Sequence, residues 1–139
     1  MKVHYSSKTS EWETPQSLFD ALNREFNFVL DVCASPKNRK CETAYFDSSL
    51  LREWGPGPAW MNPPYGRTIG SWIEKAHEES VKGVTVVCLI PARTDTAWWH
   101  DYVMLHEIRY IRGRLYFTDK NGNSGRAPFP SAVIIMRGQ

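Results

Sequence analysis

Four consecutive residues, Asn62, Pro63, Pro64 and Tyr65, have types and spacing that could do chemistry. They follow an apolar segment, residues 59–61, that is typical of a short buried strand. Proline fixes its own backbone and keeps the preceding residue out of a helix, so two in succession predict a stiff, extended loop. Neither proline has an N–H, and the loop carbonyls can therefore point outward as hydrogen-bond acceptors.

Such a loop suits group transfer to an aromatic amine. The lone pair of that amine is delocalised into its ring, which makes the nitrogen a poor nucleophile. Two acceptors on the two N–H bonds, the Asn62 side-chain oxygen and the Pro63 carbonyl, favour a tetrahedral nitrogen and stabilise the developing positive charge. Tyr65 can stack on a flat base, which must first be flipped out of a duplex. The alternative is a tight turn in which Asn62 and Tyr65 serve only folding, and the complete motif after a strand favours chemistry.

Three helices are expected around this loop. The first begins at Pro15 with Thr14 as its cap, because proline is tolerated at the first helical position. The second covers residues 69–76, and Asp95 or Thr96 caps the third. The apolar positions at helical spacing are Leu18, Phe19, Leu22, Phe26, Ile69, Trp72, Ile73, Ala76, Trp98, Trp99, Tyr102 and Val103.

Strands alternate with these helices and then cluster near the C-terminus. The strongest central-strand candidate is 84–90, which Pro91 is expected to end. This order predicts an α/β fold with a mostly parallel twisted sheet and an antiparallel C-terminal edge. In such sheets ligands bind at the carboxyl ends of strands, where Asp31 and Asn62 are expected. The other strand candidates are 28–34, 44–47, 59–61, 108–111, 115–117 and 132–136.

Length and composition limit the fold and the kind of site. The 139 residues, 42% of them hydrophobic, predict one compact globular domain over residues 11–139 after a flexible arm at 1–10. The three cysteines contain no C-x-x-C pair, which favours reduced thiols over a disulfide framework or a zinc finger. The four histidines are scattered, so no metal is assigned. No apolar run is long enough to span a membrane.

Six stretches together resemble the phage-type DNA N6-adenine methyltransferases. The resemblance implies a Rossmann-like class I methyltransferase fold, S-adenosylmethionine as the methyl donor and adenine in DNA as the acceptor. The reduced thiols favour the cytoplasm, which is the host cytoplasm if the chain is phage-encoded. The matching stretches are 12–15 (Trp-Glu-Thr-Pro), 30–34 (Leu-Asp-Val-Cys-Ala), 62–65 (Asn-Pro-Pro-Tyr), 72–76 (Trp-Ile-Glu-Lys-Ala), 89–96 (Leu-Ile-Pro-Ala-Arg-Thr-Asp-Thr) and 113–117 (Gly-Arg-Leu-Tyr-Phe).

The resemblance also implies roles for individual residues. Asn62, Pro63, Pro64 and Tyr65 match the catalytic motif. Asp31 matches the acid near the methionine part of the cofactor, and Asp47 is placed to hold its ribose. The other residues expected to bind the cofactor are Trp12, Thr14, Pro15, Cys33 and Ala34.

A basic segment, residues 109–126, could meet DNA phosphates. A solvated surface explains its charge equally well. The arginines expected to bind DNA are Arg67, Arg93, Arg112, Arg114 and Arg126, together with Arg109 of the same segment. A homodimer could enlarge the surface that reads the sequence.

Other functions use parts of the same pattern. Protein-glutamine and RNA adenine methyltransferases could act through the same 62–65 motif. A catalytically idle, methyltransferase-like module could instead bind DNA without chemistry. The complete motif argues against the idle module. The chain has no glycine-rich turn after Asp31, of the kind usual in protein-glutamine methyltransferases, because 34–36 reads Ala-Ser-Pro.

Overall fold

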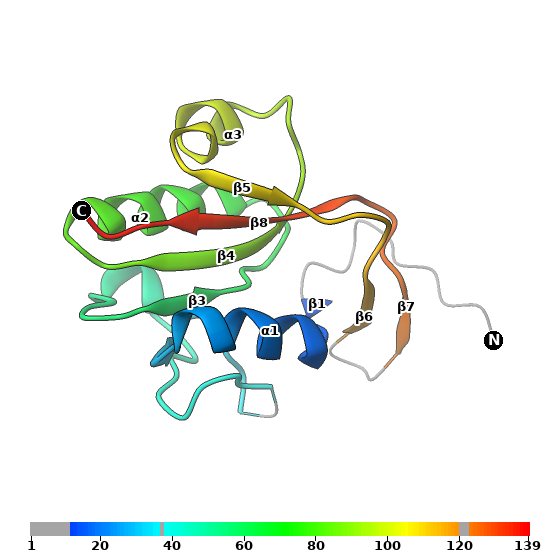
Figure 1. Ribbon diagram of the computed structural model, residues 1–139, viewed down its shortest axis with the longest axis horizontal. Helices are drawn as coiled ribbons and strands as arrows, with labels where there is room; N and C mark the ends of the chain where they lie inside the picture. Colours follow the sequence, from blue (N-terminus) through cyan, green and yellow to red (C-terminus); the bar gives the residue numbers. More distant parts are fainter. Residues whose placement is uncertain (1–11, 37, 120–122) are drawn as a thin grey trace.

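A computed structural model describes residues 12–36, 38–119 and 123–139, and the strands of this part of the chain form two sheets (Figure 1). The larger sheet has the order β2-β3-β4-β8-β5 and the smaller one the order β1-β6-β7. The strands are β1 (Trp12–Glu13), β2 (Leu30–Asp31), β3 (Ala59–Met61), β4 (Val86–Pro91), β5 (Glu107–Tyr110), β6 (Tyr116–Asp119), β7 (Ser124–Arg126) and β8 (Ser131–Met136).

The larger sheet is mixed, which corrects part of the sequence prediction. β2, β3 and β4 are parallel, whereas β8 pairs antiparallel with both β4 and β5. Of the six strand pairs in the described residues, four are antiparallel, so the prediction of a mostly parallel sheet was wrong. The predicted antiparallel C-terminal edge is present, because the late strands β8 and β5 pair antiparallel at one end of the sheet. β5 is the edge strand and is partly exposed, whereas β8 lies inside the sheet and all six of its residues are buried.

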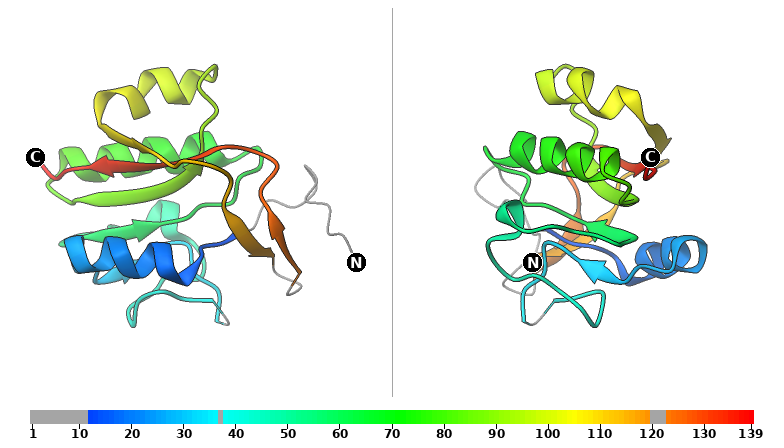
Figure 2. Two further views of the ribbon diagram at one scale, coloured as in Figure 1. Left: turned by 45° about the vertical axis from the view of Figure 1, so that its right-hand side comes forward. Right: turned by 90° about the vertical axis from the view of Figure 1, so that its left-hand side faces the viewer.

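Three α-helices flank the larger sheet: α1 (Gln16–Phe26), α2 (Ile69–Val81) and α3 (Ala97–Asp101). Figure 2 shows α1 and α2 on opposite sides of the sheet. Two short 3-10 helices, η1 (Ser49–Leu51) and η2 (Val103–Leu105), complete the helical elements of the described residues. The predicted helices are therefore confirmed.

The predicted helix starts are confirmed only in part. Thr96 caps α3, where its hydroxyl oxygen accepts a hydrogen bond from the Trp99 N–H at 3.3 Å. Thr14 does not cap α1. That helix has no side-chain cap, and the Pro15 carbonyl accepts hydrogen bonds from the Leu18 and Phe19 N–H groups. The Thr14 hydroxyl makes a long-range contact instead, described below.

Strand lengths differ most from prediction around the loops. The candidate at 28–34 is a two-residue strand, and the candidate at 44–47 makes only an isolated bridge between Ala44 and Asp31. Pro91 belongs to β4 as its last residue. The sequence did not predict β1 or β7, which are short and form their sheet only by pairing with β6.

The core lies between the sheet and its helices. Every residue of β4 and β8 is buried. The Trp60 ring of β3 packs against Phe19 of α1 at 5.4 Å and against Phe28 at 5.5 Å. The smaller sheet lies beyond the ends at which β3 and β4 finish (Figure 1). This places β1, β6 and β7 next to the loop that follows β3.

Candidate active site

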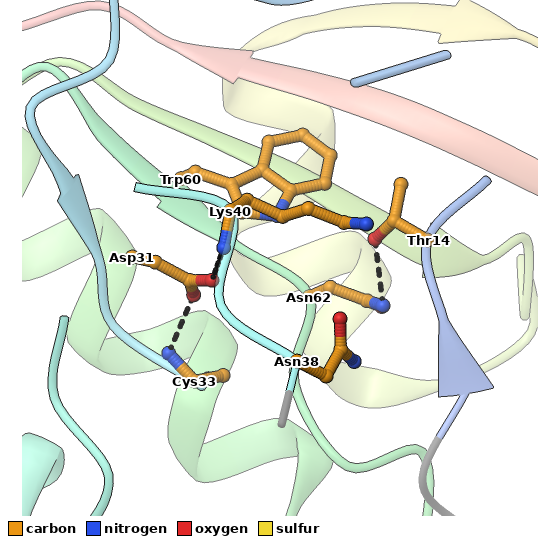
Figure 3. A pocket seen from close by; sticks show the side chains of 7 residues that line it. All are labelled: Thr14, Asp31, Cys33, Asn38, Lys40, Trp60 and Asn62. Atoms are coloured by element: carbon orange, nitrogen blue, oxygen red, sulfur yellow. Dashed lines mark hydrogen bonds between the residues drawn. The ribbon is translucent and has the colours of Figure 1, made fainter. Parts of the chain in front are cut away.

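Asn62 directly follows β3, and its side-chain amide is hydrogen-bonded to residues near the N-terminus. Its Nδ2 donates one hydrogen bond to the main-chain carbonyl of Trp12 and another to Thr14 Oγ1 at 2.9 Å (Figure 3). An amide nitrogen has two hydrogens, so both are used. Oδ1 must then point the other way, away from β1.

Tyr65 is only 2% exposed, and its hydroxyl group reaches back to Asn62. The hydroxyl donates to Asn62 Oδ1 at 2.6 Å and lies 3.1 Å from the Leu89 carbonyl at the centre of β4. Burial raises the pKa of Tyr65 well above its ordinary value, and the neighbouring Arg93 only partly offsets this. The phenol therefore stays protonated and acts as a donor.

Arg93 holds the main chain of the same loop. Its Nη1 donates a hydrogen bond of 2.8 Å to the Tyr65 carbonyl. Arg93 follows β4 and, like Arg109, is only partly exposed, whereas Arg67, Arg112, Arg114 and Arg126 are exposed. The loop after β3 is thus held by the Leu89 carbonyl of β4 and by the Arg93 side chain, which follows β4.

Four aromatic rings form a cluster around the loop. Tyr65 packs edge-on against Phe129 at 5.6 Å and against Phe117 at 6.3 Å. Trp12 contacts the same two rings, at 5.4 and 5.6 Å. Sequence reasoning did not predict roles for Phe117 or Phe129. Phe117 lies in a predicted strand, and Phe129 in a proline-flanked loop that gave no periodic signal.

Asp31, at the end of β2, is buried and organises the loop after it. One carboxylate oxygen accepts the Cys33 N–H at 3.1 Å, and the other accepts the Lys40 N–H at 2.9 Å. Burial raises the pKa of Asp31, and these two backbone hydrogen bonds oppose the rise. Burial, with the nearby Asp31 carboxylate, also raises the pKa of the Cys33 thiol, which stays neutral.

A small polar pocket lies between Asp31 and Asn62 (Figure 3). It has about 190 Å³ of empty space, part of which is open solvent. The described residues that line it are Thr14, Asp31, Cys33, Asn38, Lys40, Trp60 and Asn62.

The pocket contains some of the predicted cofactor residues and several that were not predicted. Thr14, Asp31 and Cys33 line it, whereas the exposed Asp47 is not among its described lining residues. Neither Pro15 nor Ala34 is among them. Trp60 could have been predicted, because residues two apart on a strand share a face and Asn62 follows it by two. Asn38 and Lys40 lie in an irregular loop, and no pattern in the sequence indicates their position.

The predicted DNA-binding arginines fall into two groups. Arg67, Arg112, Arg114 and Arg126 are exposed. Arg109 is engaged by two carboxylates, at 2.7 Å to Glu25 and 2.7 Å to Glu107, so its charge is already matched.

The described residues contain no group of three or more His, Cys, Asp or Glu side chains that could hold a metal. None of the helices in this part of the chain is long and apolar enough to cross a membrane.

The chain is an α/β protein with a polar pocket at the carboxyl ends of its parallel strands, the edge at which ligands bind in many α/β sheets. Its sequence matches the family model described as DNA N-6-adenine-methyltransferase (Dam) over residues 3–138. The chain therefore belongs to the Dam family, and the resemblance predicted from its motifs is confirmed.

Two curated relatives carry the same description. The "DNA N-6-adenine-methyltransferase" of Escherichia phage T1 is 34% identical over 150 aligned residues, covering 91% of this chain and 62% of the relative. The protein of that name from Haemophilus phage HP1 (strain HP1c1) is 30% identical over 105 residues, covering 72% and 61%. The chain thus spans about three fifths of the length of the curated relatives it matches.

Proposed function

We propose that this chain is a DNA N6-adenine methyltransferase that uses S-adenosylmethionine. Family membership supports this activity, and so do the descriptions of both relatives. The observation that carries the proposal is the orientation of the Asn62 amide. Both of its N–H bonds are used by Trp12 and Thr14, so Oδ1 is left as the acceptor.

The acceptor geometry fits methylation of an exocyclic amine. Oδ1 has two lone pairs, and Tyr65 uses one, so one remains for an amine N–H. The Pro63 carbonyl takes the second N–H in this proposal. Together they stabilise the positive charge that develops on the nitrogen, without a strong base. The amine proton leaves after the transfer. Pro64 stiffens the loop, and Tyr65 stacks on the flipped adenine once its ring leaves the aromatic cluster.

The fold in this proposal is a Rossmann-like class I methyltransferase domain over residues 11–139. Parallel strands β2, β3 and β4, helices on both faces and an antiparallel β8 inserted beside β4 support it. The predicted flexible arm at 1–10 lies outside the described residues.

The pocket beside Asn62 is the proposed site for the methionine part of the cofactor. An amino acid carries an ammonium and a carboxylate group, which complement Asp31 and Lys40 on the pocket wall. S-adenosylmethionine supplies an electrophilic methyl group on its sulfonium sulfur. In this proposal the pocket holds the methionine part, and the rest of the cofactor lies outside it. The other proposed contacts remain Trp12, Thr14, Pro15, Cys33, Ala34 and Asp47.

DNA is the proposed partner, held mainly through its phosphates. The exposed Arg67, Arg112, Arg114 and Arg126 are the proposed contacts. Arg93, whose Nη1 donates a hydrogen bond to the Tyr65 carbonyl, has further N–H donors and is proposed as a fifth contact. A homodimer would give a palindromic site through its two-fold symmetry. The proposed location is the cytoplasm.

The test is incubation with radiolabelled S-adenosylmethionine and an adenine-containing duplex, followed by nucleoside analysis. We expect label in N6-methyladenine, and a rate about 100- to 1,000-fold lower for Asn62→Ala, which removes one preorganised group. Parallel reactions with RNA and with protein test the two alternative acceptors. Label in either of these, and none in DNA, would replace the proposal. DNA binding without any transfer would identify the idle module.

A further inference from the structure

Thr14 lies between β1 and α1 and is 3% exposed. Its side chain does not cap the helix that follows. Its hydroxyl oxygen instead accepts a hydrogen bond from Asn62, 48 positions further along the chain (Figure 3). The buried hydroxyl of Thr14 therefore binds Asn62 and does not cap the adjacent helix.

The two acceptors on Asn62 Nδ2 have different effects. The Trp12 carbonyl can only accept, so a flipped amide would set Oδ1 against another oxygen. Thr14 accepts the second hydrogen, and two fixed acceptors define the plane of the amide. That plane sets the direction of the free lone pair on Oδ1, because a hydrogen bond to a carbonyl oxygen lies near the carbonyl plane.

We propose that Thr14 is a positioning residue that directs Asn62 Oδ1 at the target amine. This rests on the proposed methyltransferase function and differs from the cofactor contact that the sequence predicts for Thr14. A cofactor contact alone affects the KM for the methyl donor. A positioning residue affects kcat at saturating donor and DNA, because it acts on the step in which charge develops on the amine.

Matched substitutions at Thr14 distinguish the effect of its hydroxyl on kcat from the effect of its side-chain shape. Thr14→Val keeps the shape and removes the acceptor, and we expect kcat to fall about tenfold, as the loss of a hydrogen bond predicts. Thr14→Ser keeps the oxygen and should restore kcat to within about threefold of the wild type. Urea unfolding of each variant checks the fold, and Thr14→Ala replaces the valine variant if that one does not fold.

A double-mutant cycle with Asn62→Ala is the decisive measurement. If Thr14 acts through Asn62, then Thr14→Val causes no further loss of kcat in the Asn62→Ala background. The side-chain amide signal of Asn62 in a nitrogen–proton NMR spectrum should also move in Thr14→Val and return in Thr14→Ser.

The outcomes distinguish this inference from the proposed function. An equal loss of kcat in both backgrounds, or a change confined to the KM for the donor, would overturn the role of Thr14 and leave the methyltransferase intact. A wild-type protein without transfer activity, or Asn62→Ala at the wild-type rate, would overturn the proposed function, and the role of Thr14 would fall with it.

Discussion

The hydroxyl group of Tyr65 donates a hydrogen bond to Oδ1 of Asn62 across 2.6 Å. The two residues lie three positions apart in the 62–65 loop, and the proposed chemistry needs the oxygen of one and the ring of the other. In this arrangement the tyrosine ring is buried against Phe117 and Phe129. Stacking on a base therefore requires the Tyr65 ring to turn outward, and that movement breaks its hydrogen bond and frees the second lone pair of Oδ1.

Substitutions at Tyr65 separate the hydroxyl from the ring. Tyr65→Phe keeps the ring and removes one hydrogen bond, so the free energy of unfolding should fall by about 1 kcal/mol. Because Trp12 and Thr14 still orient Asn62, kcat should change less than tenfold, well below the loss expected for Asn62→Ala. Steady-state kinetics and urea unfolding measure the two effects.

Tyr65→Ala is the contrasting variant. It removes a ring that is 2% exposed and should cost about 3–5 kcal/mol of stability through the cavity it leaves. It also removes the proposed stacking surface, so transfer should be far slower than in Tyr65→Phe wherever the protein remains folded. Equal rates in the two variants would show that the ring takes no part in holding the base.

Asp31→Asn should weaken binding of the methyl donor. The substituted amide must present its NH₂ to either the Cys33 or the Lys40 N–H, which sets donor against donor. A lost hydrogen bond to a charged group predicts about 10- to 100-fold weaker binding by calorimetry. Asp101→Asn, at an exposed position on α3, is the matched control and should bind as the wild type does. Unchanged affinity in Asp31→Asn would move the donor site away from this pocket.

The sequence predicted that Asp31 and Asn62 lie at the same edge of the sheet, because this placement depends on local order. Asn62 and Asp31 each follow a short apolar strand, and the ends of parallel strands meet at one edge of a sheet. The helices were predicted for the same reason, since their apolar faces repeat within a few residues. Among the helices, only the end residues and the Thr14 cap differed from the prediction.

The parts that sequence reasoning missed depend on contacts between distant segments. β8 lies between β4 and β5. Its apolar sequence would suit any buried strand, so the sequence alone does not indicate which strands β8 pairs with. The bond between Thr14 and Asn62 joins residues 48 apart, and the bond between Arg93 and Tyr65 joins residues 28 apart. Arg93 was predicted as a phosphate contact, and its hydrogen bond to the Tyr65 carbonyl was not predicted.

Acidification should destabilise the fold through two histidines packed together. His77 Nδ1 and His106 Nε2 lie 2.9 Å apart, within hydrogen-bond distance. Burial, and then the charge of His77, lower the pKa of His106 from 6.5. Tyr102 packs on His77. Its hydroxyl donates a hydrogen bond to the Glu74 carboxylate, so that carboxylate already has a partner.

The sign of this pH dependence follows from proton binding. Between pH 6.5 and the lowered pKa, the unfolded chain holds a proton on His106 that the folded chain does not. The free energy of unfolding should therefore fall as the pH drops below about 6.5, and His106→Gln should flatten this slope. Urea unfolding between pH 7 and 5.5 measures it. The control is His100→Gln, at an exposed position on α3, which should keep the wild-type slope. An unchanged slope in His106→Gln would assign the pH dependence to other groups.

DNA binding should depend on the exposed arginines and not on the paired one. Arg114 and Arg126 are exposed, and Arg126 lies opposite Tyr116 in the β6–β7 pair. If each contacts a phosphate, Arg114→Gln and Arg126→Gln should weaken binding, and each should lower the slope of log K against log salt by about 0.9. Fluorescence anisotropy with a labelled duplex at several salt concentrations gives both quantities.

Arg109→Gln is the matched control for these two variants. Its guanidinium lies 2.7 Å from a carboxylate oxygen of both Glu25 and Glu107, so it has little charge to offer a phosphate. Its substitution should leave the salt slope unchanged, although it lies in the same basic segment. A slope that falls as much in Arg109→Gln as in the other two variants would mean that overall charge, and not individual phosphate contacts, attracts the DNA. Unchanged slopes in all three variants would place the DNA interface on another face, and the transfer chemistry of the 62–65 loop would still stand.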